Sequence, residues 1–176
     1  MKHFTLNGLI GGLLIAALLV VAAISLFWTP FDPMKLSFTA RLAGPRLTAD
    51  DIETLETLLQ HHRASAGAGH STEMTAANRA FHFHIYRAAG SAVLMSQIEN
   101  LWLRSGPYVR FLSDRMGELL QTEHKAGFTD HHAAMLAATR ARDWAALGAA
   151  CEADIKASAD LLMGILETEE AASKAS

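Results

Sequence analysis

The chain has 176 residues, of which 51% are hydrophobic, a composition that excludes a disordered protein and suits one globular domain with a short appendage. Fifteen Lys and Arg residues stand against 18 Asp and Glu residues, giving a net charge of −3. The absence of a basic block in the sequence argues against a surface that grips nucleic acid phosphates. The single cysteine, Cys151, excludes an intramolecular disulfide framework and a cysteine-rich zinc site.

An apolar run covers residues 8–28 (GLIGGLLIAALLVVAAISLFW), in which Ser25 is the one polar side chain. A helix of ~20 such residues can span the hydrocarbon core of a bilayer. A cleaved signal peptide is the alternative, but the run is longer than a usual signal sequence and ends in the bulky FWTP. We therefore expect an uncleaved anchor helix over residues 1–28 and a single-pass location in a bacterial inner membrane.

The segment 29–47 follows this run and contains three prolines. Because proline interrupts helices, we expect an irregular linker here. The charges near the run also bear on orientation, since Lys35, Arg41 and Arg46 outnumber Lys2 and the terminal amine. The positive-inside rule then predicts that the C-terminal domain lies in the cytoplasm.

Helical periodicity begins at Thr48, and the rest of the sequence has no alternating strand pattern. Thr48 is a suitable N-cap, because Asp50 and Asp51 follow it in the first turn, where carboxylates favour the helix dipole. The segment SAGAGHS (65–71) is rich in glycine and serine and predicts the end of this first helix.

The remaining pattern predicts an all-α fold, an antiparallel bundle of about six helices over residues 48–170. The last two helices are separated by Arg142 and Asp143 alone, so they should pack antiparallel. A frayed tail is expected over 171–176. The helices expected after the first cover about 72–89, 91 to a kink or break at Pro107, 112–124, 129–141 and 143–169.

Asn78 and His82 are four residues apart on the second of these helices, so their side chains share one helix face. An amide oxygen and an imidazole at this spacing are a sensible half-site for a divalent metal. A hydrogen-bonded pair in the core is the alternative. His84 falls on nearly the opposite face and is expected to be structural, and His61 and His62 are assigned to a helix end, where a cation suits the dipole.

Three strings follow one another in the order found in a known family: NRAFHFHIYRAAGS (78–91), IENLWLRSGPYVR (98–110) and DHHAAMLAATRARDWAAL (130–147). They resemble the FCD domain, the all-helical ligand-binding domain of FadR-like regulators of the GntR family. The resemblance covers about residues 48–168. It implies an effector-binding domain of a transcriptional regulator, which binds a small organic acid and works as a homodimer or with a partner regulator.

In that family an Asp or Asn, a His one turn later and two further histidines hold a divalent metal inside the bundle. The resemblance puts Asn78, His82, His132 and Asp154 at these four positions, with Asp154 in the place of the last His. The nitrogen and oxygen atoms of this set suit Zn²⁺, Mn²⁺ or Ni²⁺. A functional metal site and a hydrogen-bonded polar core without a metal both remain open.

Two further residues are candidates for this site. Arg104 is the candidate for binding the carboxylate of the effector, because a guanidinium binds a carboxylate through two hydrogen bonds. A surface ion pair is the alternative. Cys151, three residues before Asp154, is either a soft ligand or a small buried thiol, and the thiol is favoured.

The first part of the chain has a resemblance of its own. Residues 6–45, with FDP and ARLAGP near their end, are similar to the N-terminus of dipeptide and oligopeptide ABC transporter permeases. This resemblance suggests the opposite orientation, with the linker outside. An alternative function is therefore a fusion or remnant, a permease N-terminus joined to a regulator domain that acts only through partners.

Two classes of activity are not expected. A regulator of this family would carry a winged-helix domain before the FCD domain, and the apolar run occupies its place, so we expect no direct binding of nucleic acid. The sequence offers no positioned general base or nucleophile, so we expect no enzymatic activity, and a metal-dependent enzyme is the weakest alternative.

Overall fold

The computed structural model describes residues 33–119 and 127–175, and within these ranges all the regular secondary structure is helical. This confirms the predicted all-α class. The described residues form six α-helices and one short 3₁₀ helix: α2 (Pro33–Ala43), η1 (Gly44–Arg46), α3 (Ala49–Ala68), α4 (Ser71–Ala88), α5 (Ala92–Leu119), α6 (Gly127–Arg140) and α7 (Trp144–Ala175).

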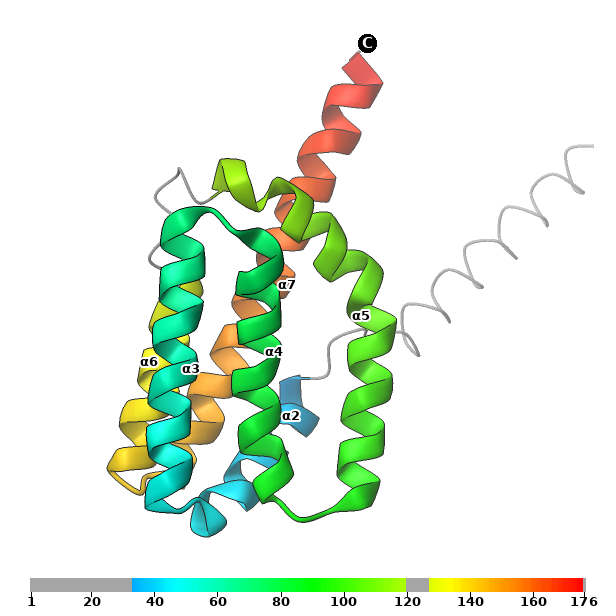
Figure 1. Ribbon diagram of the computed structural model, residues 1–176. Coiled ribbons are helices and arrows are strands. Elements are labelled where there is room, and N and C mark those ends of the chain that lie inside the picture. Colours follow the sequence, from blue (N-terminus) through cyan, green and yellow to red (C-terminus); the bar gives the residue numbers. More distant parts are fainter. Residues whose placement is uncertain (1–32, 120–126, 176) are drawn as a thin grey trace, which may run out of the picture. The chain divides into compact units, whose positions relative to one another are not determined.

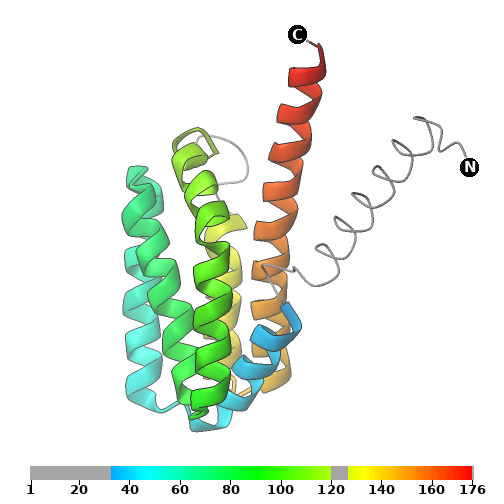
Figure 2. The same ribbon diagram turned by 90° about the vertical axis from the view of Figure 1, so that its right-hand side faces the viewer.

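Four of these helices form the centre of a bundle, in which α3 packs against α4 and α6, and α6 packs against α7. In Figures 1 and 2, α3 and α4 run side by side with α6 and α7 behind them. Helix α5 packs against the outer side of α4, and the short α2 packs against α7 and α4. Short connections at α3–α4 and α6–α7 produce the antiparallel neighbours that the sequence predicts.

The start of α3 agrees with its sequence signal. The Thr48 hydroxyl accepts a hydrogen bond from the Asp51 backbone N–H at 3.2 Å, and the Asp51 carboxylate accepts one from the Thr48 backbone N–H at 2.8 Å. This reciprocal capping box fixes the first turn. The helix ends where Gly69 adopts the left-handed conformation (φ 72°), so α3 runs deeper into 65–71 than expected.

The irregular linker expected over 29–47 is wrong for residues 33–46, which are helical. Pro33 stands at the first position of α2, where a missing N–H costs nothing, so it starts a helix instead of breaking one. Small residues let α2 lie close to α7: a Cβ at Gly148 would lie 2.5 Å from Arg41 Cγ. The packed unit therefore includes residues before Thr48.

Two other expected boundaries are also wrong. The separate helix expected over 112–124 is part of one helix, α5, which passes through Pro107 without a break, and the bend of its ribbon in the second half agrees with the kink alternative (Figure 1). Proline removes one backbone hydrogen bond, which bends a helix without always ending it. Helix α7 continues to Ala175, so the frayed tail expected from residue 171 is helical through that residue. Residues 120–126, which include the end of the helix predicted over 112–124, lie outside the described residues.

The predicted membrane location is contradicted. Within residues 33–119 and 127–175, no helix combines the length and the apolar character needed to cross a bilayer. The longest, α7, carries charged side chains such as Glu152, Lys156 and Asp160 along its length. The single-pass location and the orientation deduced from the flanking charges are therefore withdrawn. The anchor predicted over residues 1–28 lies outside the described residues.

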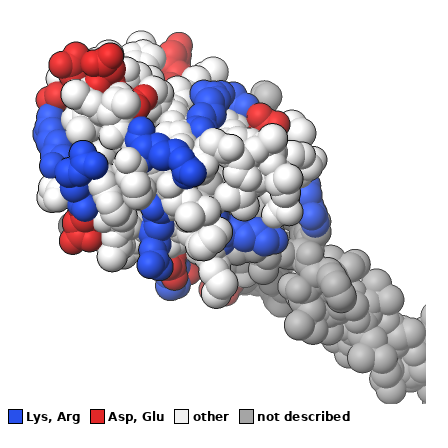
Figure 3. Space-filling model, turned by 90° about the horizontal axis from the view of Figure 1, so that it is seen from below, with Lys and Arg blue, Asp and Glu red and all other residues white. Residues whose placement is uncertain are grey.

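A continuous apolar core fills the interior between α2, α3, α4, α6 and α7 and includes one residue of α5. On the outer surface, the end of the bundle that holds η1 and the α6–α7 turn carries charges of both signs. Figure 3 shows Lys and Arg side chains there among uncharged ones, with Asp and Glu at the margin. We call the following buried residues the apolar core: Ala40, Leu55, Leu59, Phe81, Phe83, Ile85, Tyr86, Ile98, Met135, Leu136, Leu147 and Ile155.

Candidate metal centre

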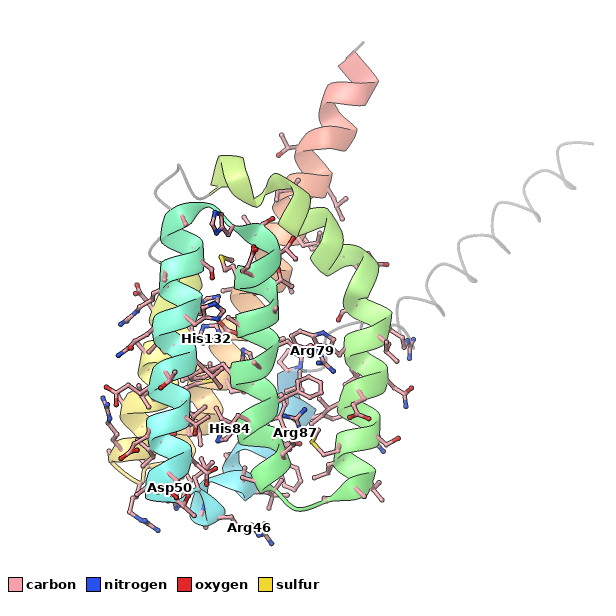
Figure 4. All side chains as sticks on the ribbon, in the orientation of Figure 1. Arg46, Asp50, Arg79, His84, Arg87 and His132 are labelled. Atoms are coloured by element: carbon pink, nitrogen blue, oxygen red, sulfur yellow. The ribbon has the colours of Figure 1, made fainter. Side chains whose placement is uncertain are left out.

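Three polar side chains from three helices meet inside the bundle. His82 comes from α4, His132 from α6 and Asp154 from α7, and their relative exposures are 3%, 2% and 9%. Their possible ligand atoms all lie within 4.8 Å of one another. Figure 4 places His132 between α3 and α4 at mid-height of the bundle. Ionisable groups are rarely buried unless they are paired or bind a ligand, so this cluster calls for a partner.

His82 and Asp154 form a buried ion pair. The His82 Nε2–H donates to Asp154 Oδ2 at 2.9 Å. Burial lowers the pKa of His82, but the hydrogen bond and negative charge of Asp154 outweigh burial and raise that pKa to about 10. Burial raises the pKa of the Asp154 carboxyl, whereas the neighbouring His132 and the bond from His82 lower it to about 2. Both groups are therefore charged at neutral pH.

The second ring nitrogen of His82 faces Tyr86. The Nδ1 atom and the Tyr86 hydroxyl are 3.3 Å apart, and the same hydroxyl lies 3.1 Å from the Cys151 sulfur. Cys151 is completely buried and contacts Tyr86 here, outside the group of three. The favoured interpretation, a small buried thiol, agrees with this placement.

His132 holds its proton on the side away from Asp154. Its Nε2–H donates to Asn78 Oδ1 at 2.8 Å. Burial lowers the pKa of His132 to about 3, so the ring is neutral near pH 7 and its Nδ1 carries a lone pair. That Nδ1 has no hydrogen-bond partner among the described residues and lies 3.7 Å from Asp154 Oδ1. A lone pair facing a carboxylate oxygen is unfavourable unless a cation lies between them, so the donor set fits a divalent metal.

A fourth histidine, His62 of α3, borders the cluster and was missed by the sequence analysis. Its exposure is 2%, and its ring centroid lies 4.6 Å from that of His132. Burial lowers the pKa of His62 to about 4, and its Nδ1 also has no partner among the described residues. The available signal was spacing: His62 continues the buried face of Leu55 and Leu59, and α3 runs on past it.

The other predicted residues fall into two groups. Asn78 is half-buried and reaches the cluster through His132. Arg104 is exposed on α5, and within the described part of the chain no hydrogen bond or ion pair joins it to the cluster. His84 lies apart from the cluster, nearer the lower end of α4 in Figure 4, where its Nε2 lies 2.9 Å from Asp51 Oδ1, as a structural residue would. Below, "histidine cluster" means His62, His82, His132 and Asp154.

Comparison with known proteins places this bundle in a family. Residues 37–157 match the family model of the FCD domain. The chain is 29% identical over 102 residues to the HTH-type transcriptional regulator McbR of Escherichia coli (strain K12), covering 58% of this chain and 44% of that protein. The solved structure of E. coli McbR/YncC shares the fold, with a TM-score of 0.69 at 23% identity over 75% of this chain and 64% of that one.

The chain therefore spans less than two thirds of the length of both relatives. The family match begins at residue 37, inside the segment expected to be a linker, which agrees with the helical structure found there. Neither the family match nor these two relatives support the resemblance of residues 6–45 to transporter permeases.

Proposed function

The chain belongs to the FCD domain family, and from this premise we propose that it is a metal-dependent effector-binding domain of a GntR-type transcriptional regulator. Its ligand in this proposal is a small organic acid. Its role is to sense that acid and pass the signal on by self-association or through a partner regulator. The similarity to McbR, a transcriptional regulator, supports a regulatory role over an enzymatic one.

One observation carries the metal proposal: the buried lone pair of His132 Nδ1 faces Asp154 Oδ1 at 3.7 Å without a hydrogen-bond partner. His82 Nε2 borders the other oxygen of the same carboxylate at 2.9 Å. We assign these three side chains as protein ligands. Two imidazoles and one carboxylate suit Zn²⁺, and also Mn²⁺ or Ni²⁺. When bound, the metal would supply a positive centre for an oxygen atom of the acid.

Asn78 has a different part in this proposal from the ligand role that the family resemblance implies. Its Oδ1 accepts a hydrogen bond from the His132 Nε2–H, on the opposite side of the ring from Asp154. This bond fixes the tautomer that presents Nδ1 to a metal, which is the usual task of an outer partner of a ligating histidine. Asn78 is therefore proposed as a positioning residue.

Metal analysis of the full chain tests the proposal. We expect the purified protein to bind one divalent ion per chain, and His132→Ala to weaken zinc binding by more than about 100-fold, beyond the usual cost of removing an outer partner. His131→Ala is the matched control, because it removes the neighbouring imidazole, and it should leave zinc affinity unchanged. A wild-type chain that binds no divalent ion would contradict the proposal.

A further inference from the structure

The proposed metal explains one of two buried nitrogen atoms that lack a partner and leaves the other unexplained. Among the described residues, His62 Nδ1 and His132 Nδ1 are the buried side-chain atoms without a hydrogen bond. His132 Nδ1 faces Asp154 and would bind the metal. His62 Nδ1 has no such role, although His62 has a relative exposure of 2%. A buried polar atom without a partner destabilises a fold, so this atom needs a separate explanation.

Packing alone does not account for an imidazole at this position. On the buried face of α3 the neighbours of His62 are the apolar Leu59 and Ala66 and the small polar Ser65, and no hydrogen bond joins Ser65 to His62 among the described residues. An apolar ring would fill the same space against His132 without leaving a nitrogen unsatisfied. The unpartnered Nδ1 of His62 therefore points to a ligand that is held inside the bundle.

His62 contacts a proposed metal ligand but is not itself one of the three proposed ligands. It is not a member of the group of three whose ligand atoms lie within 4.8 Å of one another. Its ring lies against the ring of His132, with centroids 4.6 Å apart and planes inclined by 35°. A group in this place adjoins a proposed metal ligand without being one, so it is within reach of a molecule that binds beside the metal.

We propose that His62 is an effector-binding residue, whose ring N–H donates a hydrogen bond to a carboxylate oxygen of the small organic acid while that acid contacts the metal. This inference rests on the proposed function and deepens it, because it assigns the second anchor of the acid. It gives to His62 the part that sequence analysis gave to Arg104, which is exposed on α5.

The chemistry of a buried, neutral imidazole suits this task. A neutral imidazole carries a single N–H and no charge. It would then bind a carboxylate through one directional hydrogen bond. The negative charge of the acid would be balanced by the metal and not by His62, so no uncompensated charge is buried.

A surface groove lies between α3 and α6, the two helices that carry His62 and His132. It has a volume of about 170 Å³ and is lined by Leu59 and Arg63 of α3 and by Ala133 and Leu136 of α6 among others. Arg63 and Ala133 are the sequence neighbours of His62 and His132, but the two histidines themselves do not line the groove. Arg140 and Glu56 also line it as an ion pair, so Arg63 leaves a net positive charge, which favours an anion.

The test uses the full chain loaded with Zn²⁺ and titrated calorimetrically with acetate and with succinate. His62→Phe keeps a ring against His132 and removes both nitrogens, and His61→Phe is the matched control at the exposed neighbouring position. We expect His62→Phe to bind zinc within about threefold of the wild type but to bind the acids about tenfold or more weakly, the usual effect of losing a hydrogen bond to a charged group. His61→Phe should change neither affinity.

His62→Gln provides a second variant, because its amide N–H can donate in place of the imidazole N–H. It should bind the acids more tightly than His62→Phe, and it replaces that variant in the comparison with wild type if His62→Phe does not fold. Unchanged acid affinity in His62→Phe would overturn the inference, as would loss of zinc binding, which would make His62 a metal ligand.

The wild type separates this inference from the proposed function. Zinc binding without any binding of acetate or succinate would overturn the role of His62 and leave the metal site standing. A wild type that binds no zinc would overturn both.

Discussion

The same helices supply the side chains of the apolar core and of the histidine cluster. One turn of a helix contributes to the core, and a turn close to it contributes to the cluster. On α3, Leu55 is completely buried among apolar side chains, while His62, two turns later on the same face, is buried with an unpartnered nitrogen. On α4, Ile85 belongs to the core and His82 is paired with Asp154. The helix positions are equivalent, and the chemistry of the buried atoms differs.

This difference separates stability from binding. Removing apolar surface from water stabilises the fold at every core position, and nothing else is required of these side chains. The cluster buries a carboxylate and three imidazoles, whose removal from water opposes folding unless partners compensate. The ion pair of His82 with Asp154 and the bond of His132 to Asn78 compensate in part. The remaining lone pairs are the atoms available to ligands.

Asp154→Ala should have the largest effect, and it acts on both properties. It removes a proposed ligand, so zinc affinity should fall by more than about 100-fold, and it leaves His82 charged without its partner, which should lower the free energy of unfolding by about 3–5 kcal/mol. Zinc titration and urea denaturation measure the two effects. Asp160→Ala, which breaks an exposed pair with Lys156 on the same helix, should cost less than about 1 kcal/mol.

Leu55→Ala breaks the apolar core and should leave the cluster intact. Leu55 is completely buried, so the substitution should lower the free energy of unfolding by about 2–5 kcal/mol through lost burial and the cavity left behind. Zinc affinity, measured where the variant is folded, should stay at the wild-type value. A fall in zinc affinity as large as that of Asp154→Ala would show that the two regions are not separable.

Asn78→Ala tests whether Asn78 positions His132 or binds the metal directly. Without the Asn78 carbonyl, His132 loses the acceptor that fixes its proton on Nε2, and zinc affinity should fall by about 10- to 100-fold. Asn100→Ala is the matched control, because that amide is exposed on α5 and donates to the Ser96 carbonyl of its own helix. A loss as large as that of Asp154→Ala would make Asn78 a direct ligand.

A change of one pH unit should alter zinc affinity less than the substitutions of Asp154 and Asn78 do. With a pKa of about 10, His82 is protonated in the metal-free protein near pH 7, while His132, with a pKa of about 3, is already neutral. Zinc must therefore displace one proton, and its apparent affinity should rise about tenfold per pH unit from about pH 6 to 8. Calorimetry in buffers of different ionisation enthalpy counts the protons. If zinc binding released no proton, the zinc ion would not be bound to His82.

Much of the fold could be predicted from local signals. The N-cap at Thr48 and the left-handed Gly69 depend on interactions within a few residues, so the start and approximate end of α3 are legible in the sequence. The family resemblance likewise led to His82, His132 and Asp154, which the fold brings together from three helices.

What could not be predicted depends on tertiary contacts. Residues 33–46 are helical because small residues allow α2 to pack on α7, and a proline-rich string does not reveal this. Pro107 lies within one continuous α5. His62 was assigned to a helix end because the glycines after it suggested an earlier stop, and its burial beside His132 comes from the neighbouring helix α6.

X-ray absorption at the zinc edge of the zinc-loaded full chain is the most direct test of the central claim. The account predicts a zinc ion with two imidazole ligands, seen by their multiple scattering at Zn–N of about 2.0–2.1 Å, and with oxygen atoms completing the site. The imidazole signal should fall to one ring in His132→Ala. A wild-type spectrum with no imidazole scattering, or with a sulfur ligand at about 2.3 Å that would implicate Cys151, would contradict the account.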